Sequence, residues 1–492
     1  MHDKASVKTV NVKRRQMKIC PDATRVLLRP FIPIETHRVV NIIGRAMTLS
    51  DAEVDALLAE VLAEFNDRHF NAGKIFERHF EKVRAHLFTD RELPHARKLL
   101  IGSLFTGEYA LESAALFNPS IVPHPDQNGL PSGALRVILS LRATGEGHIS
   151  SIEFRTGVLD ANNDIALDPV GRHVTAPELI PDPAYDKATF AIKIHDMGFH
   201  NPFANEMLAD LPDTFTLGEL KKIVDARKNE VRIHTHDEQR TMECIAWLAE
   251  SNYEISFSEN KPLGERIIFP HSANESNGIE DARFVRFVEN DGTPMYYATY
   301  TAYNGRVILP QLIETRDFLH FKIITLNGNA VQNKGMALFP RRIDGQFVML
   351  SRQDDENLFI MFSDNPHFWS DPVKLLRPAF PWEFSKLGNC GSPIETPEGW
   401  LVITHGVGPM RKYCIGAILL DLENPTRVIG RLAEPLIKPN ENEREGYVPN
   451  VVYSCGSLLH NGEVIIPYAM SDFASSIATV SLDELLGILK KT

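Results

Sequence analysis

The sequence predicts a mainly β fold, a five-bladed β-propeller, with an N-terminal α-helical region and a helical insertion. From about residue 253 onward, short apolar runs alternate with turns rich in Gly, Asn and Asp. Pairs of these runs recur roughly every 40–60 residues in loosely similar units, which is typical of repeated blades. Between residues 118 and 480 the chain holds more strands than a sandwich needs, so a propeller of about five blades fits better.

Residues 1–115 are predicted to form an N-terminal helical extension. Ser50 followed by Glu53 has the pattern of a capping box, and apolar residues recur at helical spacing after it. A second amphipathic run covers about 71–88, and a third covers about 92–117. We therefore expect helices to precede the β region.

Residues 116–492 are predicted to form the propeller, with one interruption. Residues 158–215 are rich in Pro and Asp and are expected to be long loops. Helical patterns return at 216–228 and 238–251. We assign the stretch from about 158 to 252 to a helix-containing insertion.

Charge and cysteine content limit the functional classes. The 492 residues include 52 Lys and Arg against 64 Asp and Glu, and the net charge of −12 disfavours nucleic acid as the main partner. Five widely spaced cysteines without a CxxC pair indicate reduced thiols in a cytoplasmic protein. The N-terminus lacks the apolar core of a secretory signal, and no run approaches the roughly 18 apolar residues of a membrane span. We expect a cytoplasmic protein without a membrane partner.

Sequence motifs of several common enzyme classes are absent. The chain has no GxGxxG after a strand, no Walker A loop, no GxSxG and no HExxH. His234 and His236 could bind a metal from one face of a strand, but the spacing indicates no third ligand. We therefore expect neither a metal nor a cofactor.

The densest polar segment of the β region is 274–283, directly before a strong strand. It combines Glu275, Glu280 and Asp281 with Arg283. Two carboxylates beside an Arg could form an acid/base unit. Composition alone favours the plainer alternative, an acidic turn capped by its own Arg.

Six segments of the β region, in this order, resemble glycoside hydrolase family 130, the family of inverting β-mannoside phosphorylases and β-mannosidases. They are GIEDAR (278–283), ALFP (337–340), SPIETPEGWLVITHGV (392–407), the strand 413–421, EREGYVPNVVYSCG (443–456) and PYAMSD (467–472). The resemblance covers about 118–485 and leaves the helical extension outside it. It implies a five-bladed propeller with the site at its axis.

The resemblance also implies roles for single residues. Asp281 matches the catalytic acid, which in this family passes its proton through a hydroxyl of the mannose ring. Inversion then requires a nucleophile on the opposite sugar face, either phosphate or water activated by a carboxylate base. The positions implied to line the sugar pocket are Asn118, Arg142, Glu280, Arg283, His405 and Asp472.

The charges around the expected nucleophile are mixed. Lys334, Arg341 and Arg352 could hold a phosphate. Glu395 stands where phosphorylases of the family commonly carry Lys, and this carboxylate, with Glu443 in support, could instead deprotonate water. We therefore favour an inverting glycosidase that hydrolyses β-mannosidic linkages, expected to be β-1,2, in small manno-oligosaccharides.

Two alternatives stay open. A β-mannoside phosphorylase would use inorganic phosphate as co-substrate and release mannose 1-phosphate. A propeller without catalysis would only bind carbohydrate, although the retention of Asp281, Glu395 and Arg352 argues against it. The N-terminal helices could form a homo-oligomer interface or a wall on the acceptor side of the pocket.

Overall fold

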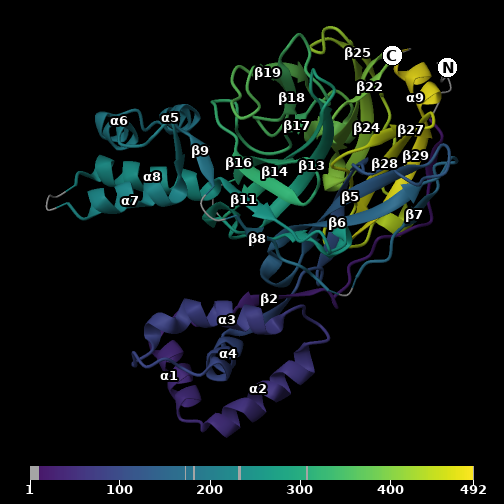
Figure 1. Cartoon of the computed structure of the whole chain (residues 1–492). Coiled ribbons are helices and arrows are strands. Elements are labelled where there is room, and N and C mark those ends of the chain that lie inside the picture. The colour runs from purple at the N-terminus through teal and green to yellow at the C-terminus, as the bar shows by residue number, and fades with distance from the viewer. Residues whose placement is uncertain (1–9, 172, 181–182, 231–233, 306–307, 491–492) are drawn as a thin grey trace.

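The computed structural model describes residues 10–171, 173–180, 183–230, 234–305 and 308–490. The chain is mainly β, as predicted: it forms five antiparallel sheets of four to six strands, and two groups of helices project from them (Figure 1). Within the described ranges, no helix combines the length and the apolar character needed to cross a bilayer.

The five sheets follow one another along the chain, and we number them in that order. Sheet 1 contains β4 (Ala115–Pro123), β5 (Leu135–Thr144), β6 (Ser150–Leu159), β7 (Ile165–Leu167) and β12 (Ile267–Ile268). Sheet 2 contains β13 (Ile279–Val288), β14 (Pro294–Tyr303), β15 (Ile308–Thr315), β16 (His320–Thr325), β11 (Tyr253–Ser256) and β8 (Glu178–Leu179). Sheet 3 contains β17 (Ala337–Leu338), β18 (Phe347–Ser351), β19 (Leu358–Ser363) and β20 (Val373–Leu376).

The remaining two sheets complete the β region. Sheet 4 contains β21 (Lys386–Asn389), β22 (Ile394–Thr396), β23 (Gly399–Val407), β24 (Tyr413–Leu420) and β25 (Val428–Arg431). Sheet 5 contains β26 (Val452–Tyr453), β27 (Leu458–His460), β28 (Glu463–Met470), β29 (Ala474–Ser481) and β1 (Val12–Arg14). The short helix α9 (Leu482–Leu489) follows β29.

The apolar core lies between the sheets. Separate clusters of buried side chains join sheet 1 to sheet 2, sheet 2 to sheet 3, sheet 3 to sheet 4 and sheet 4 to sheet 5. A fifth cluster joins sheet 5 back to sheet 1, where Leu139 and Ile465 belong to the same core. Many strands are therefore buried on both faces; every residue of β23 is buried.

The first and the last described strands meet in sheet 5. Strand β1 pairs with β29, with Val12 opposite Val480. The sequence analysis included residues 12–14 in the helical extension. The structure instead uses them as a strand, because the open edge of β29 offers backbone hydrogen bonds that no local pattern reveals.

The N-terminal helices form an arm below the sheets (Figure 1). The helices are α1 (Thr36–Met47), α2 (Asp51–Phe65), α3 (Ala72–Val83) and α4 (His95–Leu104), and a ribbon of β2 (Val26–Pro30) and β3 (Thr106–Ala110) connects them to the body. The predicted capping box is confirmed, since Ser50 Oγ accepts from Glu53 N and Glu53 Oε2 accepts from Ser50 N at 2.7 Å. The helix expected over about 92–117 ends at Leu104, because the following residues pair in β3 and β4.

Helices α5–α8 form a second projection, the insertion. It contains β9 (Ala184–Asp186), α5 (Lys187–Asp196), α6 (Pro202–Ala209), β10 (Thr214–Thr216), α7 (Leu217–Lys228) and α8 (His236–Ser251), around an apolar core of its own. The predicted helices at 216–228 and 238–251 are confirmed. The expectation of loops was wrong for α5 and α6. Asn201 caps α6, and Pro202 occupies the first helical position, which favours a helix start.

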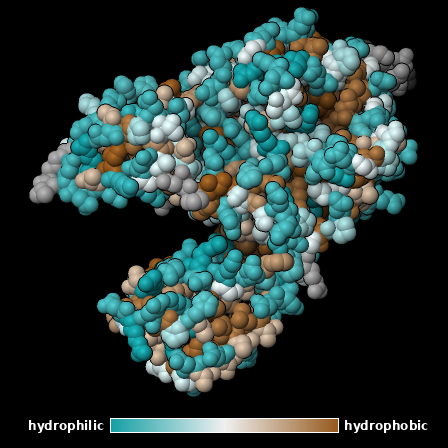
Figure 2. All heavy atoms as spheres, in the orientation of Figure 1, coloured by the Kyte–Doolittle hydropathy of each residue, from teal (hydrophilic) through white to brown (hydrophobic). Residues whose placement is uncertain are grey.

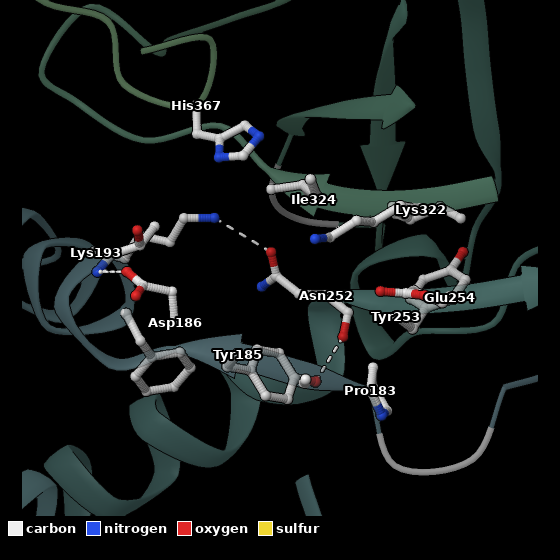
Figure 3. Close-up of a pocket in the computed structure, with 14 residues that line it drawn as sticks. Pro183, Tyr185, Asp186, Lys193, Asn252, Tyr253, Glu254, Lys322, Ile324 and His367 are labelled. Carbon is white, nitrogen blue, oxygen red and sulfur yellow. Dashed lines mark hydrogen bonds between the residues drawn. The ribbon is translucent and has the colours of Figure 1, made fainter. Parts of the chain in front are cut away.

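A cavity of about 130 Å³ lies where the insertion meets sheet 2 (Figure 3). Lys193 of α5 points into this joint, and its Nζ donates to Thr325 O at 3.0 Å and to Asn252 Oδ1 at 3.3 Å. Burial lowers the pKa of Lys193 to about 7. The ammonium group of Lys193 thus hydrogen-bonds to Thr325 of sheet 2 and to Asn252, which follows α8, and it fixes the insertion to the body.

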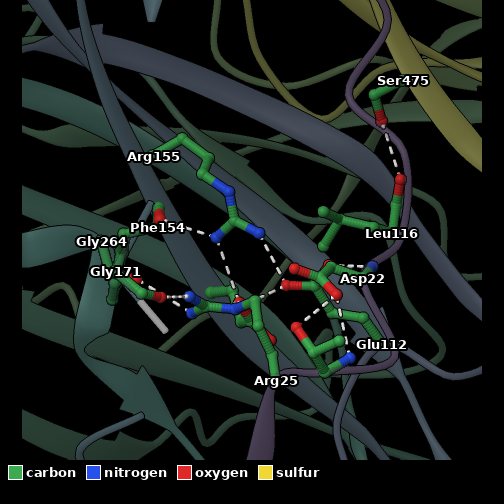
Figure 4. A network of polar contacts seen from close by, with 11 residues as sticks. Asp22, Arg25, Glu112, Leu116, Phe154, Arg155, Gly171, Gly264 and Ser475 are labelled. Carbon is green, nitrogen blue, oxygen red and sulfur yellow. Dashed lines mark hydrogen bonds and ion pairs between the residues drawn. The ribbon is translucent and has the colours of Figure 1, made fainter. Parts of the chain in front are cut away.

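A buried network of four charges fixes the arm to sheet 1 (Figure 4). Arg25 forms ion pairs with both carboxylates, Nε lying 2.8 Å from Glu112 Oε1 and Nη2 lying 2.8 Å from Glu153 Oε2, and its Nε donates to Glu153 Oε2 at 3.1 Å. Arg155 contacts the same two carboxylates at 2.6 and 3.1 Å. All four side chains are at most 4% exposed, so each charge depends on the others for its compensation.

Removing Arg25 should therefore be costly. In Arg25→Met, two buried carboxylates would share one cation, and we expect a loss of about 3–5 kcal/mol in the free energy of unfolding measured by urea denaturation. Lys13→Met is the matched control, because Lys13 also forms an ion pair, with Glu463, but its side chain is 57% exposed. We expect the control to change stability by about 0–1 kcal/mol. Equal losses in the two variants would contradict the role of the network.

Candidate active site

Asp281 lies at an irregularity near the start of β13. The pairing with β14 shifts register between Glu280 and Arg283, and Asp281 adopts a left-handed φ of 55°. Such a conformation is unusual for a residue with a side chain and persists where surrounding contacts hold it. The bulge turns the Asp281 carboxylate out of the regular strand pattern and toward sheet 1.

Two residues of sheet 1 bind this carboxylate. Asn118 also has a left-handed φ of 50°, at a register shift of β4, and its Nδ2 donates to Asp281 Oδ1 at 2.7 Å. Arg142 of β5 donates to the same oxygen at 3.5 Å and to Glu280 Oε1 at 2.8 Å. Lys334 Nζ lies 3.6 Å from the other Glu280 oxygen. The structure thus brings together five residues that the sequence analysis proposed.

The charges around Asp281 favour its ionised form. Burial alone would raise the pKa of this carboxyl, but Arg142, Lys334 and Arg283, together with the Asn118 hydrogen bond, lower it below its usual value. The neighbouring Asp472 behaves in the opposite way. Burial, followed by the negative charge of Asp281, raises the Asp472 pKa to about 7. The site therefore holds two carboxyl groups with different affinities for a proton.

A second cluster of polar groups continues from Arg283. Its Nη1 donates to Asn389 Oδ1 at 2.7 Å, and its Nη2 donates to Tyr453 Oη at 2.6 Å. The Asn389 carbonyl lies 3.1 Å from His405 Nδ1, and Arg352 Nη1 lies 3.2 Å from His405 Nε2. Asn389 and His405 thus connect Arg283, two residues after Asp281 on β13, to Arg352 through a series of contacts.

His405 is neutral in this environment. Burial and the positive charges of Arg352 and Arg283 lower its pKa well below the ordinary value. Because the Asn389 carbonyl can only accept, Nδ1 carries the hydrogen and Nε2 accepts from Arg352. His405 therefore adds no charge of its own beside Arg352 and fixes the direction of the Arg352 guanidinium group.

The sequence analysis missed several members of this second cluster. Asp355 Oδ1 lies 3.0 Å from Arg352 Nη2, and Asp355 Oδ2 lies 2.6 Å from Lys386 Nζ. Asn389 also binds the backbone of Gly335 through Nδ2 at 2.7 Å, next to Lys334. Lys386 begins β21, and polar residues at strand starts were the signal that could have revealed it.

Some buried polar atoms of the site have no partner. Across the described ranges, Asn118 Oδ1, Arg142 Nε and Arg352 Nε are buried and make no hydrogen bond within the protein. Buried polar atoms are rarely left in this state, and a bound ligand is one explanation. One acceptor and two donors are thus available to a sugar hydroxyl or an anion.

The structure does not bring Glu395 to this site. Glu395 of β22 pairs opposite Trp400, whereas His405 lies five residues further along β23, about 17 Å away at the usual rise of a strand. Arg341 binds both Glu395 oxygens, at 2.6 and 2.9 Å, and packs over the Trp400 ring. The proposals of Glu395 as base and Arg341 as phosphate ligand are therefore corrected: they form an ion pair at the other end of sheet 4.

The carboxylate of Glu443 also binds residues outside the site. Its Oε1 accepts from Arg14 Nε at 2.9 Å and from Tyr468 Oη at 2.7 Å, and its Oε2 accepts from Asn440 N at 3.0 Å. The carboxylate is 4% exposed and holds β1 against β28. The proposal of Glu443 as a supporting base is corrected to a structural role, since its oxygens are occupied by these donors.

No metal centre is found in the described ranges, where no group of three or more His, Cys, Asp or Glu side chains could hold an ion. Of the two histidines considered above, His234 directs Nε2 to Arg227 O at 2.6 Å. His236 begins α8, so the two histidines do not lie on one strand face.

Comparisons with known proteins agree on one family. The family model described as beta-1,4-mannooligosaccharide phosphorylase, of glycoside hydrolase family 130, matches residues 236–491, more than half of the chain. A 1,2-beta-oligomannan phosphorylase of Thermoanaerobacter sp. is 33% identical over 230 residues, which cover 45% of this chain and 75% of that protein. A beta-1,2-mannobiose phosphorylase of Listeria innocua is 26% identical over 371 residues, which cover 71% of this chain and 94% of that protein.

Among solved structures, the beta-1,2-mannobiose phosphorylase of Listeria innocua in complex with beta-1,2-mannobiose is similar to this chain. It superposes with a TM-score of 0.45 at 20% identity, over 77% of this chain and 93% of that chain.

The position of Glu395 generates a prediction. Glu395→Gln should keep the rate of β-manno-oligosaccharide turnover within about 2-fold of the unchanged protein, because the side chain lies remote from Asp281. Asp281→Asn is the positive control and should lower the rate by about 10²–10⁴-fold, the usual value of a general acid. Initial rates on the same substrate measure both. A 100-fold loss of rate in Glu395→Gln would contradict the conclusion that Glu395 lies outside the site.

Proposed function

Because this chain belongs to glycoside hydrolase family 130, we propose that it is a β-mannoside phosphorylase that cleaves small β-1,2-linked manno-oligosaccharides with inorganic phosphate and releases mannose 1-phosphate. The sequence analysis favoured hydrolysis and kept phosphorolysis as the alternative. Both the arrangement of the site and the names of the relatives support the alternative better.

We also infer that the five sheets are the blades of a five-bladed propeller, residues 116–492 being its main part. The cyclic series of apolar clusters from sheet 1 through sheet 5 and back supports this arrangement. Strand β4 contacts both β13 and β28, as expected for strands near a common axis. The site would then lie where the blades converge, since its residues come from all five sheets or the loops between them.

In this proposal Asp281 delivers a proton to the leaving oxygen, through a hydroxyl of the mannose ring as the family resemblance implies. Asn118 and Arg142 fix the carboxylate, and Glu280 is oriented by Arg142 and Lys334. The open Asn118 Oδ1 can accept a hydroxyl of the sugar. These groups position the ring so that the opposite face of its anomeric carbon is open to a nucleophile.

The identity of the nucleophile depends on one observation. The two carboxylates proposed as bases, Glu395 and Glu443, are bound by arginines outside the site, whereas Arg352 lies in the site between the neutral His405 and Asp355. An inverting hydrolase needs a base to activate water, but phosphate arrives as an anion and needs cations instead. Arg352 and Lys334 can supply them, and Arg352 Nε has no protein partner in the described ranges.

The proposed linkage is supported by the names of the relatives, although these names differ. Three of them are named for β-1,2-linked substrates. One from Ruminococcus albus, 34% identical over 32% of this chain, is named beta-1,4-mannooligosaccharide phosphorylase. We propose β-1,2 as the preferred linkage, with β-1,4 as the comparison in every assay.

Cytoplasmic placement and assembly stay predictions. Five cysteines are unpaired in the described ranges, which supports a reducing compartment. Apolar side chains gather on the surface of the N-terminal arm in Figure 2, and Phe31, Ile34 and Phe88 are 73%, 98% and 87% exposed. We propose that this apolar face contributes to a homo-oligomer.

Product analysis tests the proposed function. With β-1,2-mannobiose and inorganic phosphate, the purified protein should release mannose 1-phosphate, and turnover should stop when phosphate is withdrawn. Anion-exchange chromatography measures both products. Free mannose at a phosphate-independent rate would establish hydrolysis, and binding without turnover would establish a carbohydrate-binding protein.

The phosphate site generates a separate prediction. Arg352→Gln and Lys334→Gln should each raise the KM for phosphate by about 10- to 100-fold, the loss expected for one charge-assisted hydrogen bond. Arg341→Gln is the matched control, because this cation was expected to bind phosphate but pairs with Glu395. Steady-state rates at varied phosphate measure the effect. An equal rise in all three variants would contradict the assignment.

A further inference from the structure

We propose that the helical insertion positions the catalytic acid, because α8 holds, through Trp247 and Asn274, the turn that leads into Asp281. Residues 272–278 form this turn directly before β13, and we call it the acid turn. The inference rests on the proposed function only in taking Asp281 as the acid. It makes Trp247 and Asn274 positioning residues, which act on the reaction through Asp281.

The end of α8 binds the acid turn directly. Helix α8 runs toward the body and is followed by β11 of sheet 2 (Figure 1). Trp247 Nε1 donates to Asn274 Oδ1 at 2.7 Å, and Asn274 Nδ2 donates to Ser251 Oγ at 2.5 Å. Because an indole N–H can only donate, the amide of Asn274 has one possible orientation. Both ends of this side chain, which is 4% exposed, are therefore held by one helix.

The next residue of the acid turn, Glu275, is held by five donors. Its carboxylate is 0% exposed, and Oε2 accepts from His271 N at 3.0 Å, from Ser272 N at 2.9 Å and from Ser272 Oγ at 3.0 Å. Its Oε1 accepts from Tyr253 Oη at 3.0 Å and from Tyr300 Oη at 2.5 Å. Tyr253 begins β11, and Tyr300 belongs to β14. The acid turn is thus bound by α8, by the strand that follows α8 and by the partner strand of β13.

The acid turn is joined to Asp281 by a short and tightly packed stretch. Gly278 N donates to Glu275 O at 2.7 Å, and β13 pairs with β14 over two residues before the register shift at Asp281. Gly278 also lies against sheet 1, since a Cβ atom there would stand 2.5 Å from Ser150 Oγ and 2.7 Å from Ser150 N. Packing this tight does not absorb a shift, so a displaced acid turn also displaces Asp281.

Displacement of Asp281 should affect the chemical step more than substrate binding. A shift of about 1 Å in a reacting group can lower the rate by about 10²-fold. The phosphate-binding residue proposed above, Arg352, and its partner His405 follow or belong to strands of sheets 3 and 4. Loosening the acid turn should therefore lower kcat and leave the KM for phosphate nearly unchanged.

The test compares two hydrogen bonds made by α8. Trp247→Phe removes the bond to Asn274 and keeps an aromatic ring in place. Thr241→Val is the matched control, because Thr241 lies on the same helix, is 0% exposed and accepts from Asn201 Nδ2 at 2.9 Å, within the insertion. Each variant loses one hydrogen bond, so both should lower Tm by a similar amount, about 1–3 °C.

The two variants should differ in activity. On β-1,2-mannobiose, kcat should fall by about 10-fold in Trp247→Phe and stay within about 2-fold in Thr241→Val, and the KM for phosphate should stay within about 2-fold in both. A merely structural role of the insertion would give both variants the same kcat. Equal kcat values in the two variants would therefore overturn the proposal.

Two further variants complete the design. Asn274→Ala removes both contacts with α8 and should lower kcat by about 10- to 100-fold, and adding Trp247→Phe to it should cause no further loss, since residues in contact are not additive. A further 10-fold loss in the double variant would contradict a shared contact. Asp281→Asn separates this inference from the proposed function. Full activity in Asp281→Asn would show that the assigned acid is wrong, whereas slow Asp281→Asn with fully active Trp247→Phe would overturn the positioning alone.

Hydrogen exchange gives a readout that does not depend on turnover. The amides of Glu275, Asn277 and Gly278 are hydrogen-bonded in the acid turn. In Trp247→Phe, peptides that contain residues 272–281 should exchange about 5- to 10-fold faster, the change expected when a local structure loses one hydrogen bond. The same peptides should exchange at the original rate in Thr241→Val. Unchanged exchange in Trp247→Phe would overturn the proposal whichever product the protein releases.

Discussion

The site depends on a buried carboxylate that sheet 2 alone cannot stabilise. Asp281 stands in a left-handed conformation at a bulge of β13, and its charge is compensated by Asn118 and Arg142 from sheet 1. Burying a charge without such partners costs several kcal/mol. The bulges at Asp281 and Asn118 can meet only because sheets 1 and 2 are held against each other, and the apolar cluster between these two sheets does so.

Two halves of different charge share this centre. One half holds the carboxylate of Asp281, which we propose as the acid. The other, around Arg352 and the neutral His405, offers positive charge in a protein whose net charge is −12. Opposite requirements on two faces of a sugar suit an inverting displacement. The Arg283–Asn389 contacts join the halves, so that the position of the nucleophile is tied to the position of the acid.

Local and motif-borne features were predictable from the sequence, and long-range pairings were not. The capping box at Ser50 and the Asp281 segment were visible in single stretches of chain. The pairing of β1 with β29 joins residues more than 450 positions apart and leaves no local trace. Glu395 was misassigned because side chains at either end of one hairpin look alike in sequence. Glu443 was misassigned because its partners, Arg14 and Tyr468, come from distant strands.

The central claim is that the acid and the nucleophile act on opposite faces of the sugar and that the nucleophile is phosphate. Real-time proton and phosphorus NMR of β-1,2-mannobiose cleavage in phosphate buffer tests both parts in one measurement, because the phosphorus signal identifies a sugar phosphate and the proton signal of its anomeric carbon gives the configuration. The account predicts α-mannose 1-phosphate as the first product. A β-configured phosphate would contradict attack from the opposite face, and free mannose formed without an equal amount of mannose 1-phosphate would contradict phosphate as the nucleophile.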